Sequence, residues 1–133
     1  MGNPPSVVDA LADYRRLVEV GVGRRTDVAA ELAARGRDVT ATDVRERDVP
    51  EGVAFVRDDV TDPDSSIYAD ADAVYALNCP PELHGALAAV AADADAACLF
   101  TTLGGDQPAV PVERRTVASG TLYVARERGR PDA

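Results

Sequence analysis

The sequence predicts an α/β fold: a doubly wound, mostly parallel sheet that ends in an antiparallel hairpin. Between residues 17 and 101, short apolar segments of strand length alternate with helical segments. A turn that contains two glycines joins the first of these strands to the next helix. Near residue 120, two β-type segments are separated by only two residues. Strands that alternate with helices are typical of βαβ units, and a two-residue connection is typical of a β-hairpin.

The parallel part is expected to begin with an amphipathic helix over about 6–15. Ser6 is a favourable N-cap for this helix, and Asp9 stands three residues later, as in a capping box. Apolar periodicity then predicts strands at 17–20, 39–44, 53–56, 73–77 and 96–101. Together with the glycine and proline residues at helix ends, it predicts one helix at 26–35 and another from Pro80 or Pro81 to about Ala92. The segment 58–71 is expected to contain at most a short helix.

The C-terminal part of the sequence has a different pattern. Two glycines and two prolines stand between Leu103 and Arg114, so a long helix is not expected there. Two segments rich in threonine and valine follow, at 116–118 and 121–124, and Ser119-Gly120 lies between them. This pattern predicts a hairpin whose two-residue turn is Ser119-Gly120.

Length and composition restrict the class of protein. The chain has 133 residues, which fits a single domain over 1–126, and the polar residues 127–133 are expected to form a flexible tail. Hydrophobic residues make up 46% of the chain, which excludes disorder along its whole length. No apolar run approaches the ~20 residues of a membrane span. The first residues do not have the pattern of a secretion signal, so we expect a cytoplasmic protein.

The charge balance is strongly acidic, with 23 acidic residues, 14 arginines, no lysine and a formal net charge of −9. One interpretation is adaptation to a salt-rich cytoplasm, where an acidic surface keeps proteins soluble. The other is a GC-rich genome, which favours arginine over lysine. An acidic surface argues against a nucleic-acid partner. Because the Debye length falls to ~3 Å in molar salt, charge is a weaker guide there, and nucleic acid stays an open alternative.

No metal site is predicted. The two cysteines are too few for a structural zinc cluster, and the acidic stretch from Asp58 to Asp72 does not have the spacing of a metal-binding loop. Cys79 is either a reactive thiol near the start of a helix or a small buried thiol, and Cys98 is expected in the core.

The sharpest motif is the turn after the first strand, which reads Glu19-Val20-Gly21-Val22-Gly23. Glycines at these positions permit a tight turn and a close approach by a ligand, and the next helix directs free N–H groups toward it. Asp43 ends the following strand, where a carboxylate can accept hydrogen bonds from ribose hydroxyls. The sequence therefore predicts a nucleoside-containing ligand. The alternative is a plain turn, and Thr26 stands where G-x-G-x-x-G has its third glycine.

Three charged residues of this turn have two interpretations each. A carboxylate at the position of Glu19 loses hydration, so it needs a partner. That partner is either a ligand's amino group or a structural contact with Arg24, Arg25 or the backbone. If Arg24 and Arg25 point inward, they favour a phosphate-bearing ligand, because guanidinium matches phosphate oxygens. Otherwise the two arginines are solvated.

Candidate catalytic residues follow the strand at 73–77. Asn78 stands at the carboxyl end of that strand, where ligands bind in such folds, and is a candidate both for binding and for catalysis. Glu82 is a weaker candidate in the same loop. His84, the single histidine, is a general base if it faces the cleft and otherwise a surface residue. The alternative for the whole loop is structural, with prolines that begin the next helix.

Residues 17–101 resemble a Rossmann-type nucleotide fold, and two groups share the pattern. In the class I methyltransferases, which use S-adenosylmethionine, the first motif is similar to the segment from Val18 to Gly23. This resemblance implies that Gly21 and Gly23 approach the methionine part, that Glu19 helps to organise it and that Asp43 binds the ribose. It also implies that Asp58 or Asp59 lies near the adenine. The terminal hairpin suits this group. A related loop in amino-methylating enzymes is similar to the stretch around Asn78.

The second group is the nicotinamide-binding regulatory domain of potassium-uptake systems. The segments 58–62 and 71–74 resemble its middle section. This resemblance implies an NAD or adenine-nucleotide ligand and a regulatory function. In that group, however, the position of Glu19 is usually apolar, and the hairpin has no clear counterpart.

The whole chain also resembles a small archaeal family of uncharacterised proteins, number 146 of the UPF series. The glycine turn and the stretch from Cys79 to Leu83 carry this resemblance. Three functions follow: a methyltransferase-like domain that binds S-adenosylmethionine, with catalysis open; an NAD or nucleotide sensor; and a non-catalytic scaffold. The short connections show no insertion large enough to form a substrate pocket, so we expect a homodimer or a partner subunit to complete any active site.

Overall fold

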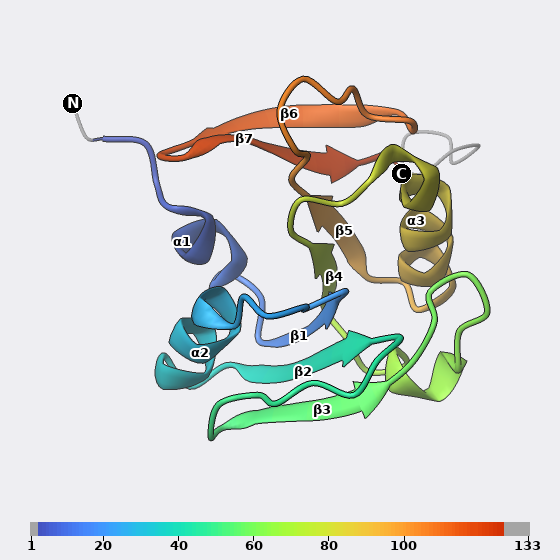
Figure 1. The fold of residues 1–133 in the computed structure, drawn as a ribbon. Helices are drawn as coiled ribbons and strands as arrows, with labels where there is room; N and C mark the ends of the chain where they lie inside the picture. Colours follow the sequence, from blue (N-terminus) through green and yellow to red (C-terminus); the bar gives the residue numbers. More distant parts are fainter. Residues whose placement is uncertain (1–2, 127–133) are drawn as a thin grey trace.

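The computed structural model describes residues 3–126, which contain one seven-stranded sheet (Figure 1). The strand order is β3-β2-β1-β4-β5-β7-β6. The strands that lie side by side from β3 to β5 are parallel, whereas β7 is antiparallel to both β5 and β6. A mostly parallel sheet with an antiparallel end is therefore confirmed. The strands are β1 (Arg16–Val20), β2 (Asp38–Asp43), β3 (Val53–Arg57), β4 (Ala73–Ala76), β5 (Ala97–Phe100), β6 (Val112–Val117) and β7 (Gly120–Ala125).

The helices are short, and they cover both faces of the sheet. They are α1 (Val7–Leu11), α2 (Asp27–Ala34) and α3 (His84–Asp93), with 3-10 turns η1 (Ser65–Ile67) and η2 (Pro81–Leu83). The predicted capping box of α1 is present, since Ser6 and Asp9 bond each other's backbone N–H groups. The helix predicted over 6–15 ends at Leu11, because the chain then turns so that Tyr14 packs on the core and Arg16 joins the sheet.

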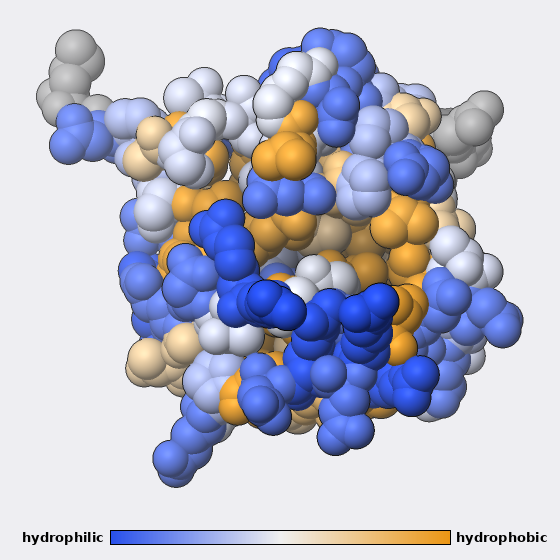
Figure 2. Space-filling view, viewed as in Figure 1, coloured by the Kyte–Doolittle hydropathy of each residue, from blue (hydrophilic) through white to orange (hydrophobic). Residues whose placement is uncertain are grey.

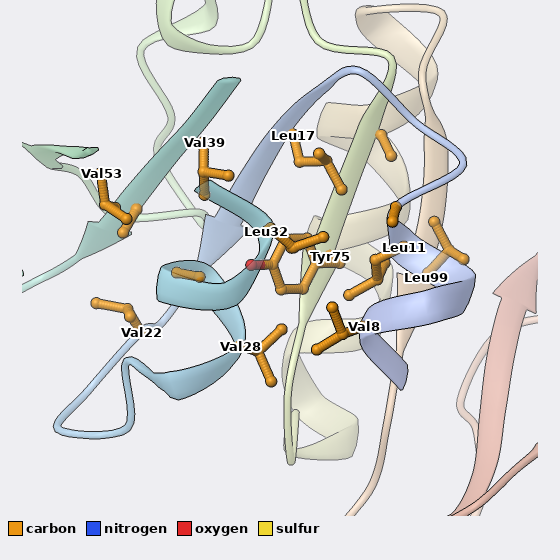
Figure 3. Packing of buried hydrophobic residues seen from close by; sticks show 14 of the residues in the cluster. Val8, Leu11, Leu17, Val22, Val28, Leu32, Val39, Val53, Tyr75 and Leu99 are labelled. Carbon is orange, nitrogen blue, oxygen red and sulfur yellow. The ribbon is translucent and has the colours of Figure 1, made fainter. Parts of the chain in front are cut away.

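Two hydrophobic clusters lie on opposite faces of the sheet. On one face α1 and α2 pack on residues such as Leu17, Tyr75 and Leu99 (Figure 3). On the other face α3 packs on Val74 and Phe100. In Figure 1, α1 and α2 lie to the left of the sheet and α3 to its right. Side chains that alternate along β1 supply both clusters, as expected for a doubly wound sheet.

The hairpin turn differs by one residue from the prediction. The turn residues are Ala118 and Ser119, and Val117 pairs with Gly120. Gly120 opens β7 with a φ of 143°, a conformation that glycine adopts without the steric cost of a side chain. A shift of one residue changes which side chains oppose one another. As a result, Leu122 is buried opposite Arg115 rather than opposite Val117.

The segment between β5 and β6 crosses the sheet as a loop. Residues 101–111 contain no helix, as the glycines and prolines predict. An apolar depression of about 650 Å³ lies beside this loop, between α3 and the last strands. None of the helices within residues 3–126 is long and apolar enough to cross a membrane. The predicted tail at 127–133 lies outside the described residues.

Candidate functional site

The predicted site residues meet at one edge of the sheet. The parallel strands β1, β2, β4 and β5 all end at this edge, and each is followed by a loop that carries polar groups. In open α/β sheets this carboxyl edge is where ligands bind. The loop after β1 lies near the middle of the view in Figure 1.

The glycine turn is held against β2. The N–H groups of Gly21 and Val22 donate to the Thr42 carbonyl at 2.9 and 3.0 Å. Gly21 has a φ of 70° and Gly23 of 58°, values that favour glycine. A Cβ atom on Gly21 would meet no atom within 4 Å, so the space in front of this residue is open. The turn therefore presents bare backbone to a ligand.

Asp43 links the glycine turn to the loop after β2. Its carboxylate accepts hydrogen bonds from the N–H groups of Gly23, at 2.8 Å, and Arg45, at 3.1 Å. The Nε atom of Arg47 lies 3.5 Å from the same carboxylate. The structure thus brings Asp43 and Gly23 together, as the motif predicts. Sequence reasoning missed Arg47, whose only signal is a basic residue four positions after Asp43.

Glu19 is buried in β1, with 1% of its surface exposed. Burial raises the pKa of its carboxyl group to about 7, although the hydrogen bond from Tyr75 acts in the opposite direction. The Tyr75 hydroxyl donates that bond at 2.8 Å. The structural alternative of an ion pair with Arg24 or Arg25 is wrong: among the described residues the direct partner of this carboxylate is Tyr75.

The two arginines of the turn differ in position. Both side chains are exposed. Arg25 Nη2 lies 3.9 Å from Asp27 Oδ2, and Arg25 lines a pocket at the sheet edge. Arg24 does not line that pocket.

The pocket lies between the glycine turn and the β6–β7 hairpin and has a volume of about 450 Å³. A hollow near the middle of the face in Figure 2 is bordered below by strongly hydrophilic side chains. The turn of the hairpin and the loop after β5 enclose this pocket. Sequence reasoning did not predict this pocket, and the expected homodimer or partner subunit stays a prediction. The residues that line this pocket are Val7, Arg25, Val28, Leu77, Asn78, Thr101, Thr102, Gly104, Ser119, Gly120, Thr121 and Tyr123.

Asn78 is the one catalytic candidate that lines this pocket. Its φ of 51° is unusual for a non-glycine residue. The Asn78 N–H donates to Thr101 Oγ1 at 2.8 Å, and the Cys79 N–H donates to the Thr101 carbonyl at 2.8 Å. These bonds fix the loop after β4 to the end of β5. Glu82 is exposed and lies outside the pocket lining.

His84 is fully buried, so the surface position considered for it is wrong. Its Nδ1 atom accepts from the Ala109 N–H at 3.0 Å, and its Nε2 atom lies 2.9 Å from the Cys79 carbonyl. Because Nδ1 is an acceptor here, Nε2 carries the proton and donates a hydrogen bond to the Cys79 carbonyl oxygen. Both ring nitrogens are occupied, which favours a structural role: His84 fastens the loop at 101–111 to the start of α3.

The acidic residues after β3 organise their own loop. Asp58 accepts from the Tyr68 hydroxyl at 2.8 Å, and the Asp58 N–H donates to the Asp43 carbonyl at 3.0 Å. Asp59 accepts from the N–H and the hydroxyl of Thr61, which lowers the pKa of Asp59. Asp58 is therefore next to Asp43 at the carboxyl edge of the sheet.

The two cysteines are buried and free. Burial raises the pKa of Cys79 to about 11 and that of Cys98 to about 12, so both thiols stay protonated near neutral pH. This favours the interpretation of Cys79 as a small buried thiol. Among residues 3–126, no group of three or more His, Cys, Asp or Glu side chains could hold a metal ion.

This sheet order and the glycine turn beside Asp43 define a Rossmann-like domain with a methyltransferase-like fold. The chain belongs to the uncharacterised protein family UPF0146, whose family model matches residues 1–128. A family member from Halobacterium salinarum is 61% identical over 128 residues, which are 96% of this chain and 99% of that protein. One from Archaeoglobus fulgidus is 49% identical over 102 residues, 75% of this chain and 78% of that protein.

Solved structures with this fold include methyltransferases. An RNA methyltransferase from Salinibacter ruber in complex with S-adenosyl-L-homocysteine has a TM-score of 0.64 and 16% identity, and the match covers 100% of this chain and 98% of that chain. A TehB-like S-adenosylmethionine-dependent methyltransferase from Corynebacterium glutamicum has a TM-score of 0.55 and 15% identity, covering 90% and 85%. These similarities confirm the methyltransferase-like fold.

Proposed function

We propose that this protein binds S-adenosylmethionine at the carboxyl edge of its sheet. The observation that carries the proposal is the contact between the Asp43 carboxylate and the Gly23 N–H, beside the open space at Gly21. An acid and a glycine turn in this arrangement suit a ribose and the chain attached to it. Three solved structures with this fold that hold S-adenosylhomocysteine, two of them methyltransferases, support the same ligand.

The residues present fit this cofactor. Asp43 accepts one hydrogen bond at Oδ1 from a backbone N–H, and its remaining lone pair is available to a ribose hydroxyl. Asp59 or Asp58 would face the adenine. Gly21 and Gly23 would face the methionine end, and the buried Glu19 would support the turn from behind. When bound, S-adenosylmethionine supplies an activated methyl group, and the pocket lined by Asn78 is the place for a methyl acceptor. Methyl transfer is therefore the reaction that we propose for this site.

The test of cofactor binding is a calorimetric titration with S-adenosylhomocysteine in molar potassium chloride. We expect a Kd in the micromolar range. Asp43→Asn is expected to weaken binding by at least about tenfold, because hydrogen bonds to a charged carboxylate are lost. The matched control is Asp38→Asn, which changes an exposed aspartate at the opposite end of β2. Absence of heat with the folded protein, or an equal loss in both variants, would contradict the proposal.

The second candidate is an NAD or adenine-nucleotide sensor. The two arginines of the turn, Arg24 and Arg25, and Arg47 beside Asp43 favour it, because guanidinium groups match the phosphates that S-adenosylmethionine does not have. A parallel titration with NAD distinguishes the two. Binding of NAD alone would move the protein to the sensor class. The cytoplasmic location, the single domain and a homodimer or partner subunit stay predictions from the sequence.

A further inference from the structure

The pocket between the glycine turn and the β6–β7 hairpin differs in charge from the rest of the chain. Of its 12 lining residues, one is charged, and that residue is Arg25. The chain has 23 acidic residues and a net charge of −9, yet none of the acidic residues within 3–126 lines this pocket. The one charged group that a ligand in this pocket would contact is therefore a cation, in a protein whose overall field repels anions.

The uncharged polar groups of the pocket can donate hydrogen bonds. Thr102, Ser119 and Thr121 bring hydroxyl groups, and Asn78 brings a side-chain amide. These residues come from three loops that are far apart in the sequence: the ends of β4 and β5 and the hairpin turn. Asn78 has a φ of 51°, a left-handed conformation that asparagine adopts more readily than most residues, and its N–H is fixed by Thr101. Donors around one cation are the surroundings that an oxyanion needs.

Arg25 is available to such a ligand. Its nearest acidic partner, Asp27, lies 3.9 Å away, and the two side chains are 71% and 69% exposed. An exposed ion pair of this kind contributes little to stability. The guanidinium group can therefore turn from Asp27 to a bound anion at little cost.

We propose that this pocket binds a small methyl acceptor that carries a phosphate or carboxylate group, with Arg25 as its anchor. The proposal rests on the proposed function, because it places the acceptor beside a bound S-adenosylmethionine. The acceptor's nucleophilic atom bonds to the methyl carbon while the carbon–sulfur bond breaks. The bonding electron pair stays on the sulfur, S-adenosylhomocysteine is the product, and the acceptor's proton goes to water.

The size of the pocket favours a small anion over a nucleic acid. The loops that follow β2 and β3 at the same edge carry both signs of charge, with exposed Arg45 and Glu46 after β2 and exposed Asp59 after β3. A phosphate chain that extended beyond the pocket would therefore find no continuous basic surface there. The volume of about 450 Å³ suits a metabolite-sized molecule.

The experiment is an NMR titration of the ¹⁵N-labelled protein saturated with S-adenosylhomocysteine. Inorganic phosphate is added in one series and acetate in another, at constant ionic strength in potassium chloride. We expect saturable shifts of the Thr102, Ser119 and Gly120 amide signals, and the tighter series shows whether the acceptor carries phosphate or carboxylate. Arg25→Gln is expected to weaken binding by about tenfold or more. Arg24→Gln removes the same charge from the neighbouring residue outside the pocket and is expected to retain binding.

Three outcomes would overturn the proposal: no saturable shift with either anion, equal weakening in both variants, or an RNA oligonucleotide that binds these residues more tightly than either small anion. The same titrations are run on the protein without S-adenosylhomocysteine. If that cofactor product fails to bind while phosphate still shifts the pocket signals in an Arg25-dependent way, the proposed function fails and the anion site stands. If S-adenosylhomocysteine binds and neither anion produces saturable shifts, the anion-site proposal is wrong and the proposed function stands.

Discussion

At the scale of single residues, Glu19 is the most unusual group in the chain, a carboxyl in the middle of a hydrophobic layer. Its pKa is raised to about 7, so the folded protein holds a proton at pH values where the unfolded chain has lost it. The free energy of unfolding is therefore highest below the unfolded pKa and falls as the pH rises through about 7. A shift from 4.5 to about 7 corresponds to about 3 kcal/mol.

We expect Glu19→Gln to remove this pH dependence. The amide has the same shape, still accepts from the Tyr75 hydroxyl and has no charge to bury. Denaturant unfolding should give a variant more stable than the parent above about pH 8 by up to ~3 kcal/mol, with the difference vanishing in mild acid. The same variant should bind S-adenosylhomocysteine more weakly. The exposed Glu51→Gln is the control, and a parent whose stability is flat between mild acid and mild base would contradict the prediction.

The sequence predicts those site residues that lie close to one another along the chain. Gly21, Gly23 and Asp43 follow from one strand-turn-helix unit and the strand after it. Tyr75 was missed as the partner of Glu19 because it is 56 positions away and becomes a neighbour only when β4 pairs with β1. The burial of His84 was missed for the same reason, since its partner Ala109 comes from a distant loop.

At the scale of elements, alanine substitutions can test whether the open face of the glycine turn binds a ligand. Gly21 and Gly36 both have positive φ, 70° and 82°, and a Cβ on either meets no atom within 4 Å. Alanine at either position should cost about 1–2 kcal/mol, because a side chain disfavours this conformation. Gly36 follows α2 at the opposite edge of the sheet, so Gly36→Ala is a matched control for backbone strain.

Gly21→Ala should abolish or strongly weaken S-adenosylhomocysteine binding, whereas Gly36→Ala should leave it unchanged. The added methyl group would occupy the space into which the turn opens. Urea unfolding of both variants checks that their losses of stability are similar, and calorimetry measures the binding. A Gly21→Ala variant that binds as tightly as the parent would show that the turn serves chain geometry alone.

Most elements of the fold were predictable because their hydrophobic periods are local, as the strands ending at Val20, Asp43 and Phe100 show. The hairpin register was not, because two adjacent two-residue turns, 118–119 and 119–120, fit the same residues. In the structure Val117 pairs with Gly120, which places the turn at Ala118 and Ser119. Both Val117 and Leu122 are buried, but they lie on one face of the hairpin in either register, so their hydrophobicity could not select the turn from the sequence. The hairpin also borders the pocket that the sequence did not predict.

At the scale of the whole molecule, charge and topology act on the same edge of the sheet. The insertion of β7 between β5 and β6 carries the hairpin turn toward the carboxyl edge, where it closes the cationic pocket. The acidic segment 58–72 begins at the same edge, where the Asp58 N–H donates to the Asp43 carbonyl, and ends at the opposite edge, where the Asp72 N–H donates to the Arg16 carbonyl. The domain therefore places the single arginine of this pocket in a chain that has 23 acidic and 14 basic residues.

That distribution makes stability depend on salt. Net charge of −9 on a small domain produces self-repulsion, which extends over a Debye length of about 10 Å in 0.1 M salt and ~3 Å in molar salt. We expect the melting temperature to rise steadily with potassium chloride. Asp62→Asn with Asp70→Asn removes two exposed charges from the acidic segment, so this variant should be more stable than the parent at low salt and gain less from added salt. If both proteins melt at temperatures independent of salt, the acidic composition reflects the base composition of the genome rather than adaptation to a salt-rich cytoplasm.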